Sequence, residues 1–194
     1  MKRKLILLGG GGHCKSCIDV IEQSKQFQIV GILDTLEKVG QKVLAYDTIG
    51  TDEKIDELVA EEFEFLVTIG QIRSPKVRAK LFARLQESNA KIAIVISSRA
   101  YVSHYAKIGA GTIVMHDALV NADAQIGQNC IINSKALIEH DVLIEDHCHI
   151  STAAVLNGGV TVKEGTFFGS NAVSKEAVST SKEAFIKAGS LFLG

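Results

Sequence analysis

The chain has 194 residues, enough for one large or two small domains. Apolar residues make up 46% and charged residues 22%, so a core can form and disorder is not expected. The formal net charge is -1 without an extended basic block, which argues against a nucleic-acid partner. No apolar run has the length of a membrane span, and the run at residues 5–8 is too short for a signal peptide. We therefore expect a cytoplasmic protein.

The first 92 residues alternate between apolar strands and amphipathic helices. Strands are expected at residues 4–8, 28–33, 64–69 and 91–96, and helices at about 14–24, 52–62 and 75–88. The third helix carries Val77, Leu81 and Leu85 at four-residue spacing, which predicts its apolar face. Such alternation is typical of βαβ units, so the sequence predicts a Rossmann-like α/β domain over residues 1–92.

The glycine-rich segment GGGGH at residues 9–13 follows the first strand and opens the first helix. Backbone N–H groups and the helix dipole bind phosphate at such a position. The dinucleotide fingerprint requires glycine or alanine where this chain has Cys14, so the match to nicotinamide or flavin enzymes is partial. Asp34 ends the second strand, where a ribose-binding carboxylate belongs. We predict a nucleotide pocket here; the alternative is a tight turn with a solvated aspartate.

A six-residue repeat dominates the second half of the chain. An aliphatic or aromatic side chain recurs at every sixth residue from Val102 to Phe168, and a smaller one precedes each by two residues. This period fits neither a helix nor a sheet meander and is typical of a parallel β-helix. Three repeats would form one triangular coil, with corners two or three residues after each aliphatic position. We predict a β-helix over residues 93–194, with the tail after Asn171 as a C-terminal cap.

Five of the six histidines lie in the repeat region. The register places His140 at a corner and His149 on a strand, both pointing away from the β-helix core. Glu139 and Asp141 flank His140. A neighbouring carboxylate orients an imidazole and raises its basicity, as a general base requires. His140 is therefore the candidate base, the alternative for each histidine being an exposed polar residue.

The four cysteines form two pairs. Cys130 and Cys148 occupy the small inward position of the repeat and are expected to fill the core. Cys14 and Cys17 lie at the start of a helix, where the pKa of a thiol can fall, so redox or metal chemistry is the alternative to packing. A zinc ribbon would need a second such pair, which the sequence lacks.

These features resemble the sialic acid O-acetyltransferase-like branch of the left-handed β-helix acyltransferases, which includes bacterial N-acetyltransferases acting on UDP-4-amino sugars. The resemblance rests on the hexads, GGGGH, Asp34, TIG at residues 68–70 and NSKALIEHD at residues 133–141, and it extends from Leu5 to about Gly189. It implies a left-handed β-helix and a homotrimer with active sites between adjacent β-helices. It also implies direct transfer from acetyl-CoA, without a metal, to the amine of a nucleotide-linked (UDP) sugar in bacterial glycan biosynthesis.

The resemblance implies roles for individual residues. His140 would take a proton from the attacking amine, with Asp141 tuning it and Asn133 close to the site. The residues implied to line the nucleotide-sugar pocket are Gly11, Gly12, His13, Asp34, Thr35 and Gly70. The residues implied to contact acetyl-CoA are His149, Gly158, Gly169, Ser170 and Ala188. Arg78 lies in a stretch that often follows in the family, without an assigned role.

Three other functions stay open at this point. An O-acetyltransferase of sialic or related nonulosonic acids would use the same base on a hydroxyl group. A zinc hydratase like the gamma-type carbonic anhydrases would need three histidines at a subunit boundary. His104 and His140 fall on the same corner, but Glu145 stands at the position of the third ligand. A non-catalytic trimeric scaffold would use the β-helix only for assembly.

Overall fold

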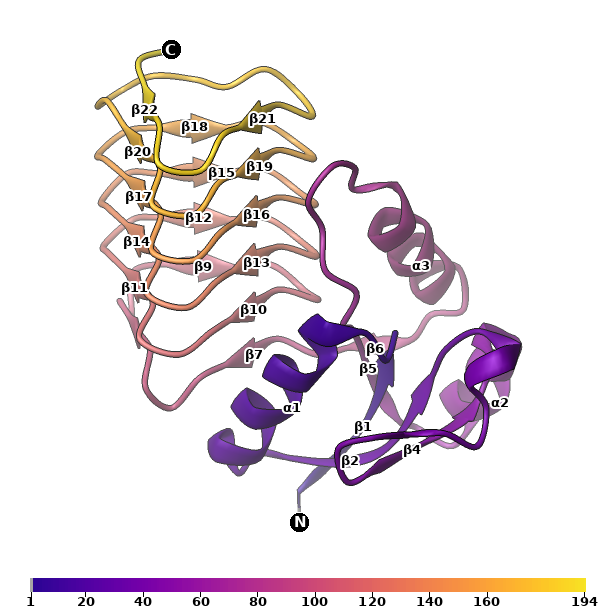
Figure 1. Ribbon diagram of the computed structural model, residues 1–194. Helices are drawn as coiled ribbons and strands as arrows, with labels where there is room; N and C mark the ends of the chain where they lie inside the picture. The colour runs from indigo at the N-terminus through magenta and orange to yellow at the C-terminus, as the bar shows by residue number, and fades with distance from the viewer. Residues whose placement is uncertain (1) are drawn as a thin grey trace.

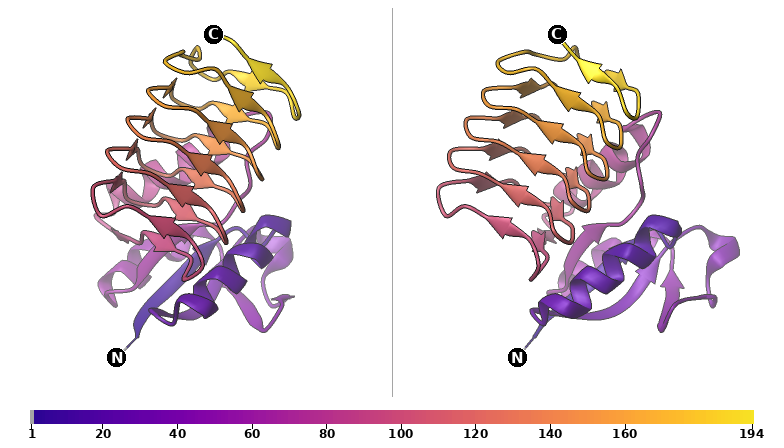
Figure 2. Two further views of the ribbon diagram at one scale, coloured as in Figure 1. Left: turned by 90° about the vertical axis from the view of Figure 1, so that its left-hand side faces the viewer. Right: turned by 60° about the vertical axis from the view of Figure 1, so that its left-hand side comes forward.

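The computed structural model describes residues 2–194 and shows an α/β domain followed by a column of stacked coils (Figure 1). The C-terminus lies at the end of the column that is remote from the α/β domain, as the two views of Figure 2 also show. The α/β domain packs beside the lower coils of the column.

The α/β domain contains a six-stranded sheet of order β3-β4-β2-β1-β5-β6, in which only the β3–β4 pair is antiparallel. The strands are β1 (Arg3–Leu8), β2 (Phe27–Leu33), β3 (Lys42–Val43), β4 (Tyr46–Gly50), β5 (Glu64–Val67) and β6 (Lys91–Ile92). The helices are α1 (Gly12–Ser24), α2 (Ile55–Ala60) and α3 (Lys76–Glu87), with 3-10 turns η1 (Leu36–Lys38) and η2 (Asp52–Lys54). The predicted α/β class is confirmed. The carboxyl ends of β1, β2 and β5 meet at one edge, where such sheets bind ligands.

The strand predicted at residues 91–96 is in fact two strands that belong to different sheets. β6 pairs with β5, whereas β7 (Val95–Ile96) pairs with β10 (Ile113–Val114) in the column of coils. We place the boundary between the two domains, residues 1–92 and 93–194, at this change of sheet.

The second domain is a left-handed parallel β-helix with three sheets, as predicted. The first sheet contains β7, β10, β13 (Ile131–Ile132), β16 (His149–Ile150), β19 (Phe167–Phe168) and β21 (Phe185–Ile186). The second contains β8 (Tyr101–Val102), β11 (Leu119–Val120), β14 (Leu137–Ile138), β17 (Val155–Leu156), β20 (Val173–Ser174) and β22 (Leu191–Phe192). The third contains β9 (Lys107–Ile108), β12 (Gln125–Ile126), β15 (Leu143–Ile144) and β18 (Thr161–Val162).

From Gly111 onward, each corner of the β-helix turns on a residue in the left-handed backbone region. A positive φ recurs at every sixth residue from Gly111 to Gly189, three positions after each inward residue of the repeat. Ten of these residues are not glycine, and five of the ten are aspartate or asparagine, which tolerate this region better than other side chains. The predicted corner positions are thereby confirmed.

The tail after Asn171 adds further coils instead of the separate cap that we predicted. β20 and β22 extend the second sheet and β21 extends the first. The aliphatic pattern stops here because Ser174 and Thr180 take the inward positions. Their hydroxyl oxygens accept hydrogen bonds from the backbone N–H groups of Asn157 and Lys163, both at 2.9 Å. Since these buried hydroxyls are paired, the coil continues without an aliphatic side chain at either position.

The cysteines are all buried, and none is in a disulfide. Cys130 and Cys148 fill the β-helix core, as predicted. Cys14 and Cys17 pack between α1, the α/β sheet and the first sheet of the β-helix. Burial raises the pKa of both thiols, which opposes the thiolate that redox or metal chemistry would require. Packing is therefore the role that the structure supports.

Of the apolar face predicted for helix α3, Leu85 is buried and Leu81 is half-buried, but Val77 is not part of the buried face. Arg78, Phe82 and Leu85 are buried, while Val77 is 59% exposed. The reason is that α3 packs against the corner of the β-helix as well as against the sheet. The Arg78 guanidinium donates hydrogen bonds to the carbonyl oxygens of Val67, Ile69 and Asn129 and to the side-chain oxygen of Asn129. It thus connects the two domains.

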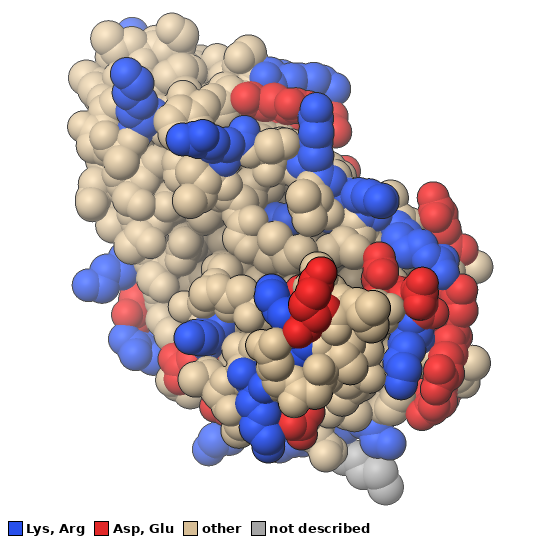
Figure 3. Space-filling model, turned by 45° about the vertical axis from the view of Figure 1, so that its right-hand side comes forward, with Lys and Arg blue, Asp and Glu red and all other residues tan. Residues whose placement is uncertain are grey.

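The surface carries charges of both signs. In Figure 3 they gather over the α/β domain, while much of the β-helix surface in this view is uncharged. Within residues 2–194, no helix combines the length and the apolar character needed to cross a bilayer.

Candidate functional site

The glycine loop borders a pocket of about 470 Å³ at the start of α1. The pocket is lined by Gly9, Gly11, Gly12, His13, Asp34, Lys38, Ile69, Gly70 and Ile72. No side chain caps α1, and within the described chain the N–H groups of Gly11, Gly12 and His13 donate to no protein atom. A Cβ on Gly11 or Gly12 would meet nothing within 4 Å, so the loop faces open space. Free N–H groups at a helix N-terminus form an anion site suited to phosphate.

Asp34 lies at the centre of the loop region. Its carboxylate accepts hydrogen bonds from the N–H of Gly10 at 2.6 Å, the N–H of Thr35 at 2.7 Å and the ammonium of Lys38 at 3.0 Å. Burial alone would raise the pKa of Asp34, but these donors outweigh it and the net pKa is lowered, so the group is ionised. A carboxylate has about four acceptor positions, which leaves one for a ligand hydroxyl.

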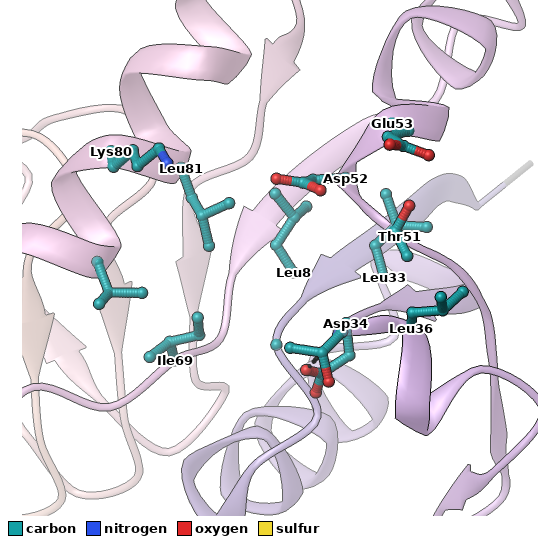
Figure 4. Close-up of a pocket in the computed structure, with 13 residues that line it drawn as sticks. Leu8, Leu33, Asp34, Leu36, Thr51, Asp52, Glu53, Ile69, Lys80 and Leu81 are labelled. Atoms are coloured by element: carbon teal, nitrogen blue, oxygen red, sulfur yellow. Dashed lines mark hydrogen bonds between the residues drawn. The ribbon is translucent and has the colours of Figure 1, made fainter.

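A second pocket of about 520 Å³ lies on the other side of Asp34 (Figure 4). Gly9, Asp34 and Ile69 line both pockets, so the two are neighbours. The remaining residues of the second pocket are Leu8, Leu33, Thr35, Leu36, Thr51, Asp52, Glu53, Val77, Lys80 and Leu81. The residues predicted to line a nucleotide-sugar pocket are thus divided, with Thr35 in this second pocket and the other five around the loop.

His149 is covered by the α/β domain and is only 6% exposed. It points away from the β-helix core, as the register predicted, but it is not on the outer surface. Its Nδ1 lies 2.5 Å from the carbonyl oxygen of Gln71 and its Nε2 lies 3.1 Å from the amide nitrogen of Asn133. Because a carbonyl only accepts, Nδ1 carries the proton and Nε2 accepts from Asn133. Burial lowers the pKa of His149 to about 4, so the ring stays neutral.

His13 lies next to His149, with 6.4 Å between the ring centroids. Burial lowers the pKa of His13 to about 3, assisted by the positive charge of Arg78. The Nε2 atom of His13 is buried and has no hydrogen-bond partner among the described residues. A neutral imidazole with a free polar atom at the edge of a pocket can hydrogen-bond a ligand without adding charge.

His140 has the geometry of a general base. Its ring is exposed, and Nδ1 lies 2.7 Å from the Asp141 carboxylate. Since a carboxylate only accepts, Nδ1 carries the proton and the lone pair of Nε2 is free. The hydrogen bond to Asp141 raises the pKa of His140, and the charges of Asp141 and Glu139 add to this effect. Gly158 makes room for the ring, because a Cβ there would lie 2.7 Å from His140 Cε1.

A single chain keeps His140 apart from Asn133 and His149. His140 follows β14 of the second sheet, whereas Asn133 and His149 belong to the first sheet, beside the α/β domain. Asn133 therefore contacts His149 and not His140. Of the residues expected to contact acetyl-CoA, Gly169, Ser170 and Ala188 lie at the corner after the first sheet, where a Cβ on Gly169 would be 2.5 Å from the Ala188 nitrogen. Gly158 lies at the corner of His140 instead.

A further cluster, which was not predicted from the sequence, is formed by Ser97, His116 and Asp19. Ser97 Oγ lies 2.7 Å from His116 Nδ1, and His116 Nε2 lies 2.9 Å from Asp19. The connectivity is that of a Ser-His-Asp triad, but Ser97 is buried and lines neither of the two pockets above. The cluster ties α1 to the β-helix.

The described residues contain no group of three histidine, cysteine or acidic side chains arranged to hold a metal ion. His104 and His140 share a corner, as the sequence indicated. Glu145, at the position of a third ligand, is paired instead with Lys163 at 2.8 Å.

Comparison with known families now identifies the two domains. Residues 4–85 match the family described as PglD N-terminal domain, and residues 105–140 match bacterial transferase hexapeptide (six repeats). The α/β domain is thus similar to the N-terminal domain of the PglD family, and the coils are similar to bacterial transferase hexapeptide repeats. This confirms the resemblance on which the sequence analysis relied. No significant match was found among curated protein sequences.

Two solved structures of acetyltransferases cover nearly the whole chain. The acetyltransferase domain of PglB from Neisseria gonorrhoeae is 28% identical, with a TM-score of 0.92 over 99% of this chain and 92% of that one. PerB from Caulobacter crescentus, in complex with CoA and GDP-perosamine, is 28% identical, with a TM-score of 0.91 over 98% and 88%. WeeI from Acinetobacter baumannii, at 19% identity and a TM-score of 0.61 over 100% and 97%, shares the fold.

Proposed function

We propose that the protein transfers an acetyl group from acetyl-CoA to the amine of a nucleotide-linked 4-amino sugar. The observation that carries this proposal is the exposed His140–Asp141 pair, in a chain whose α/β domain holds a phosphate-binding loop and an adjoining pocket. The solved complexes support it, since the PglB domain binds acetyl-CoA and PerB binds CoA with GDP-perosamine. The reaction belongs to bacterial glycan biosynthesis and takes place in the cytoplasm.

In the proposed mechanism, the sugar amine attacks the thioester carbonyl carbon directly. His140 Nε2 accepts the proton that the amine loses as the C–N bond forms. The tetrahedral intermediate then breaks its C–S bond, and protonated His140 returns the proton to the CoA sulfur. No acyl-enzyme is needed, because the four thiols are buried. Proton transfer of this kind contributes about 10²- to 10⁴-fold to the rate.

We further propose that the active site forms between chains of a homotrimer. His140 lies on one corner of the β-helix, and the glycine loop with His13 lies beside another sheet. A neighbouring chain can therefore bring its loop to this chain's His140. In this arrangement the nucleotide occupies the glycine loop with Asp34, Thr35 and Gly70. Acetyl-CoA runs along the β-helix past Gly158, Gly169, Ser170 and Ala188, while His149 and Asn133 orient the groups around it.

The reaction type can be tested by measuring CoA thiol release with three acceptors. A nucleotide-linked 4-amino sugar should support turnover, whereas the corresponding 4-hydroxy sugar and free sialic acid should not. An amine is a better nucleophile than a hydroxyl group, and once it has attacked the thioester it gives up a proton to His140. Faster thiol release with either hydroxyl acceptor would show an O-acetyltransferase instead. Acetyl-CoA hydrolysis without acceptor is the blank.

The pH dependence of the reaction should respond to Asp141. A base must be unprotonated, so kcat/KM should fall as the pH drops through the pKa of His140. Because Asp141 raises that pKa, D141N should move this acid limb to lower pH and also reduce kcat, since the ring loses its orienting partner. E139Q is the matched control, because Glu139 acts only through its charge and should shift the limb less. An unchanged limb in D141N would show that another group sets it.

A further inference from the structure

The pocket beyond Asp34 has features of a site for a flat ring. Its walls carry the aliphatic side chains of Leu8, Leu33, Leu36, Ile69, Val77 and Leu81. Two of them are far out of the core, Leu36 at 77% and Val77 at 59% exposure. Leu36 and Val77 come from different elements, η1 and α3, yet line the same pocket. A planar ring bound in this pocket would cover part of this aliphatic surface.

This step rests on the function proposed above. The position of the pocket relative to the glycine loop then identifies the part of a nucleotide-linked sugar that would occupy it. Phosphates bound at the N–H groups of Gly11 and Gly12 would place the ribose near the free acceptor position of Asp34. The pocket continues from Asp34 in the direction away from the loop. The group attached to the ribose there is the nucleobase.

One wall of the pocket carries an unpaired carboxylate. In Figure 4, Asp52 is directed toward the space between Leu8 and Leu81, and no hydrogen bond drawn there reaches it. Its neighbour Glu53 is directed to the outer side. Among the described residues the Asp52 carboxylate is in none of the ion pairs, although Lys80 lines the same pocket. A carboxylate in this position is available to accept hydrogen bonds from a base.

The edges of the four bases differ in what they offer to a carboxylate. Guanine presents two adjacent donors, N1–H and N2–H, which match two acceptor oxygens. Uracil presents a single donor, N3–H, between two carbonyl oxygens that a carboxylate repels. Adenine and cytosine place a ring nitrogen acceptor beside their amino group.

We propose that this pocket binds guanine, with Asp52 accepting from N1–H and N2–H and with aliphatic side chains of the pocket wall against the ring. The acceptor sugar is then carried on GDP, in place of the UDP expected from the resemblance. Asp52 is the specificity-determining residue, and it takes no part in acetyl transfer.

Calorimetric titration of the whole protein with GDP and UDP tests this assignment. GDP should bind at least tenfold more tightly than UDP. D52N should weaken GDP binding by roughly 10- to 100-fold, because a hydrogen bond to a charged group is lost, and should leave UDP binding unchanged. E57Q is the matched control, because Glu57 is an exposed carboxylate on the adjoining α2 that lines neither pocket, and it should stay within about twofold of wild type.

Inosine diphosphate lacks the N2 amino group of guanine, so it tests the same contact by a change in the ligand instead of the protein. It should bind more weakly than GDP to wild type, and this difference should disappear in D52N. UDP binding as tightly as GDP, or GDP affinity unchanged in D52N, would overturn the guanine assignment and leave the proposed acetyl transfer standing. Binding of neither nucleotide would contradict both proposals. Equal melting temperatures of wild type, D52N and E57Q confirm that the variants are folded.

Discussion

Replacing His140 by alanine should lower kcat by about 10²- to 10⁴-fold while acetyl-CoA affinity stays within about twofold of wild type. Nε2 of His140 is the one free basic atom beside the Asp141 carboxylate, and the exposed ring supports no part of the core. H104A is the matched control, because His104 is an exposed histidine in the same corner column, two coils lower. Thiol release and titration with acetyl-CoA provide the two measurements. H140A turning over at the wild-type rate would remove the base from the mechanism.

The same variant can show whether the site lies between chains. In the proposed trimer, H140A and H13A chains that are expressed together would mix, and one interface would combine an intact His140 with an intact His13 of the neighbour. Activity should then exceed that of either variant alone. If one chain held the whole site, every chain in the mixture would lack one histidine and the mixture would stay inactive.

The second large effect is expected on stability, from replacing Arg78 by methionine. Methionine keeps much of the side-chain volume but leaves the carbonyl oxygens of Val67 and Ile69 and the side-chain oxygen of Asn129 without their buried donor. Unsatisfied buried acceptors cost about 1–3 kcal/mol each and do not add fully, so the loss in unfolding free energy should be about 3 kcal/mol or more.

Urea unfolding at a fixed protein concentration measures this loss, since assembly makes stability depend on concentration. R84M is the control, because Arg84 is in the same helix but forms an exposed pair with Asp56. Its loss should be within about 1 kcal/mol. A loss of similar size for R78M and R84M would show that the connection between the domains contributes little.

The local repeat could be predicted from the sequence because every coil obeys the same rule. The register of Val102 and its successors fixed the inward positions and placed His140 at a corner. The additional coils of the tail were not predicted because Ser174 and Thr180 are polar residues at inward positions. Their hydrogen bonds to the preceding coil explain why these positions can be polar.

Contacts between the domains could not be predicted. From the sequence, a single arginine in an amphipathic helix is predicted to be exposed. Arg78 is instead buried, with 1% exposure, because the β-helix corner supplies Asn129 as an acceptor. Likewise, the register shows that His149 leaves the β-helix core but not that the α/β domain folds over it. The glycine loop and Asp34 were recognisable because strand ends on one edge of a parallel sheet converge. The sequence could not show that the Asp52 carboxylate is unpaired, because this depends on the residues that surround it in the folded pocket.

The ladder of the β-helix limits how this protein can change in length. Each strand pairs with the strand 18 residues later, as Ile113 does with Ile131. Loss of one residue between Asp117 and Asn171 would exchange buried and solvent-facing side chains along the strand that follows, whereas loss of 18 removes one whole coil and preserves every face. The column can therefore grow or shrink by duplication or deletion of complete coils. Such a change would shift the position of His140 along the β-helix axis relative to the α/β domain. The local structure of His140 and that of the α/β domain would stay the same.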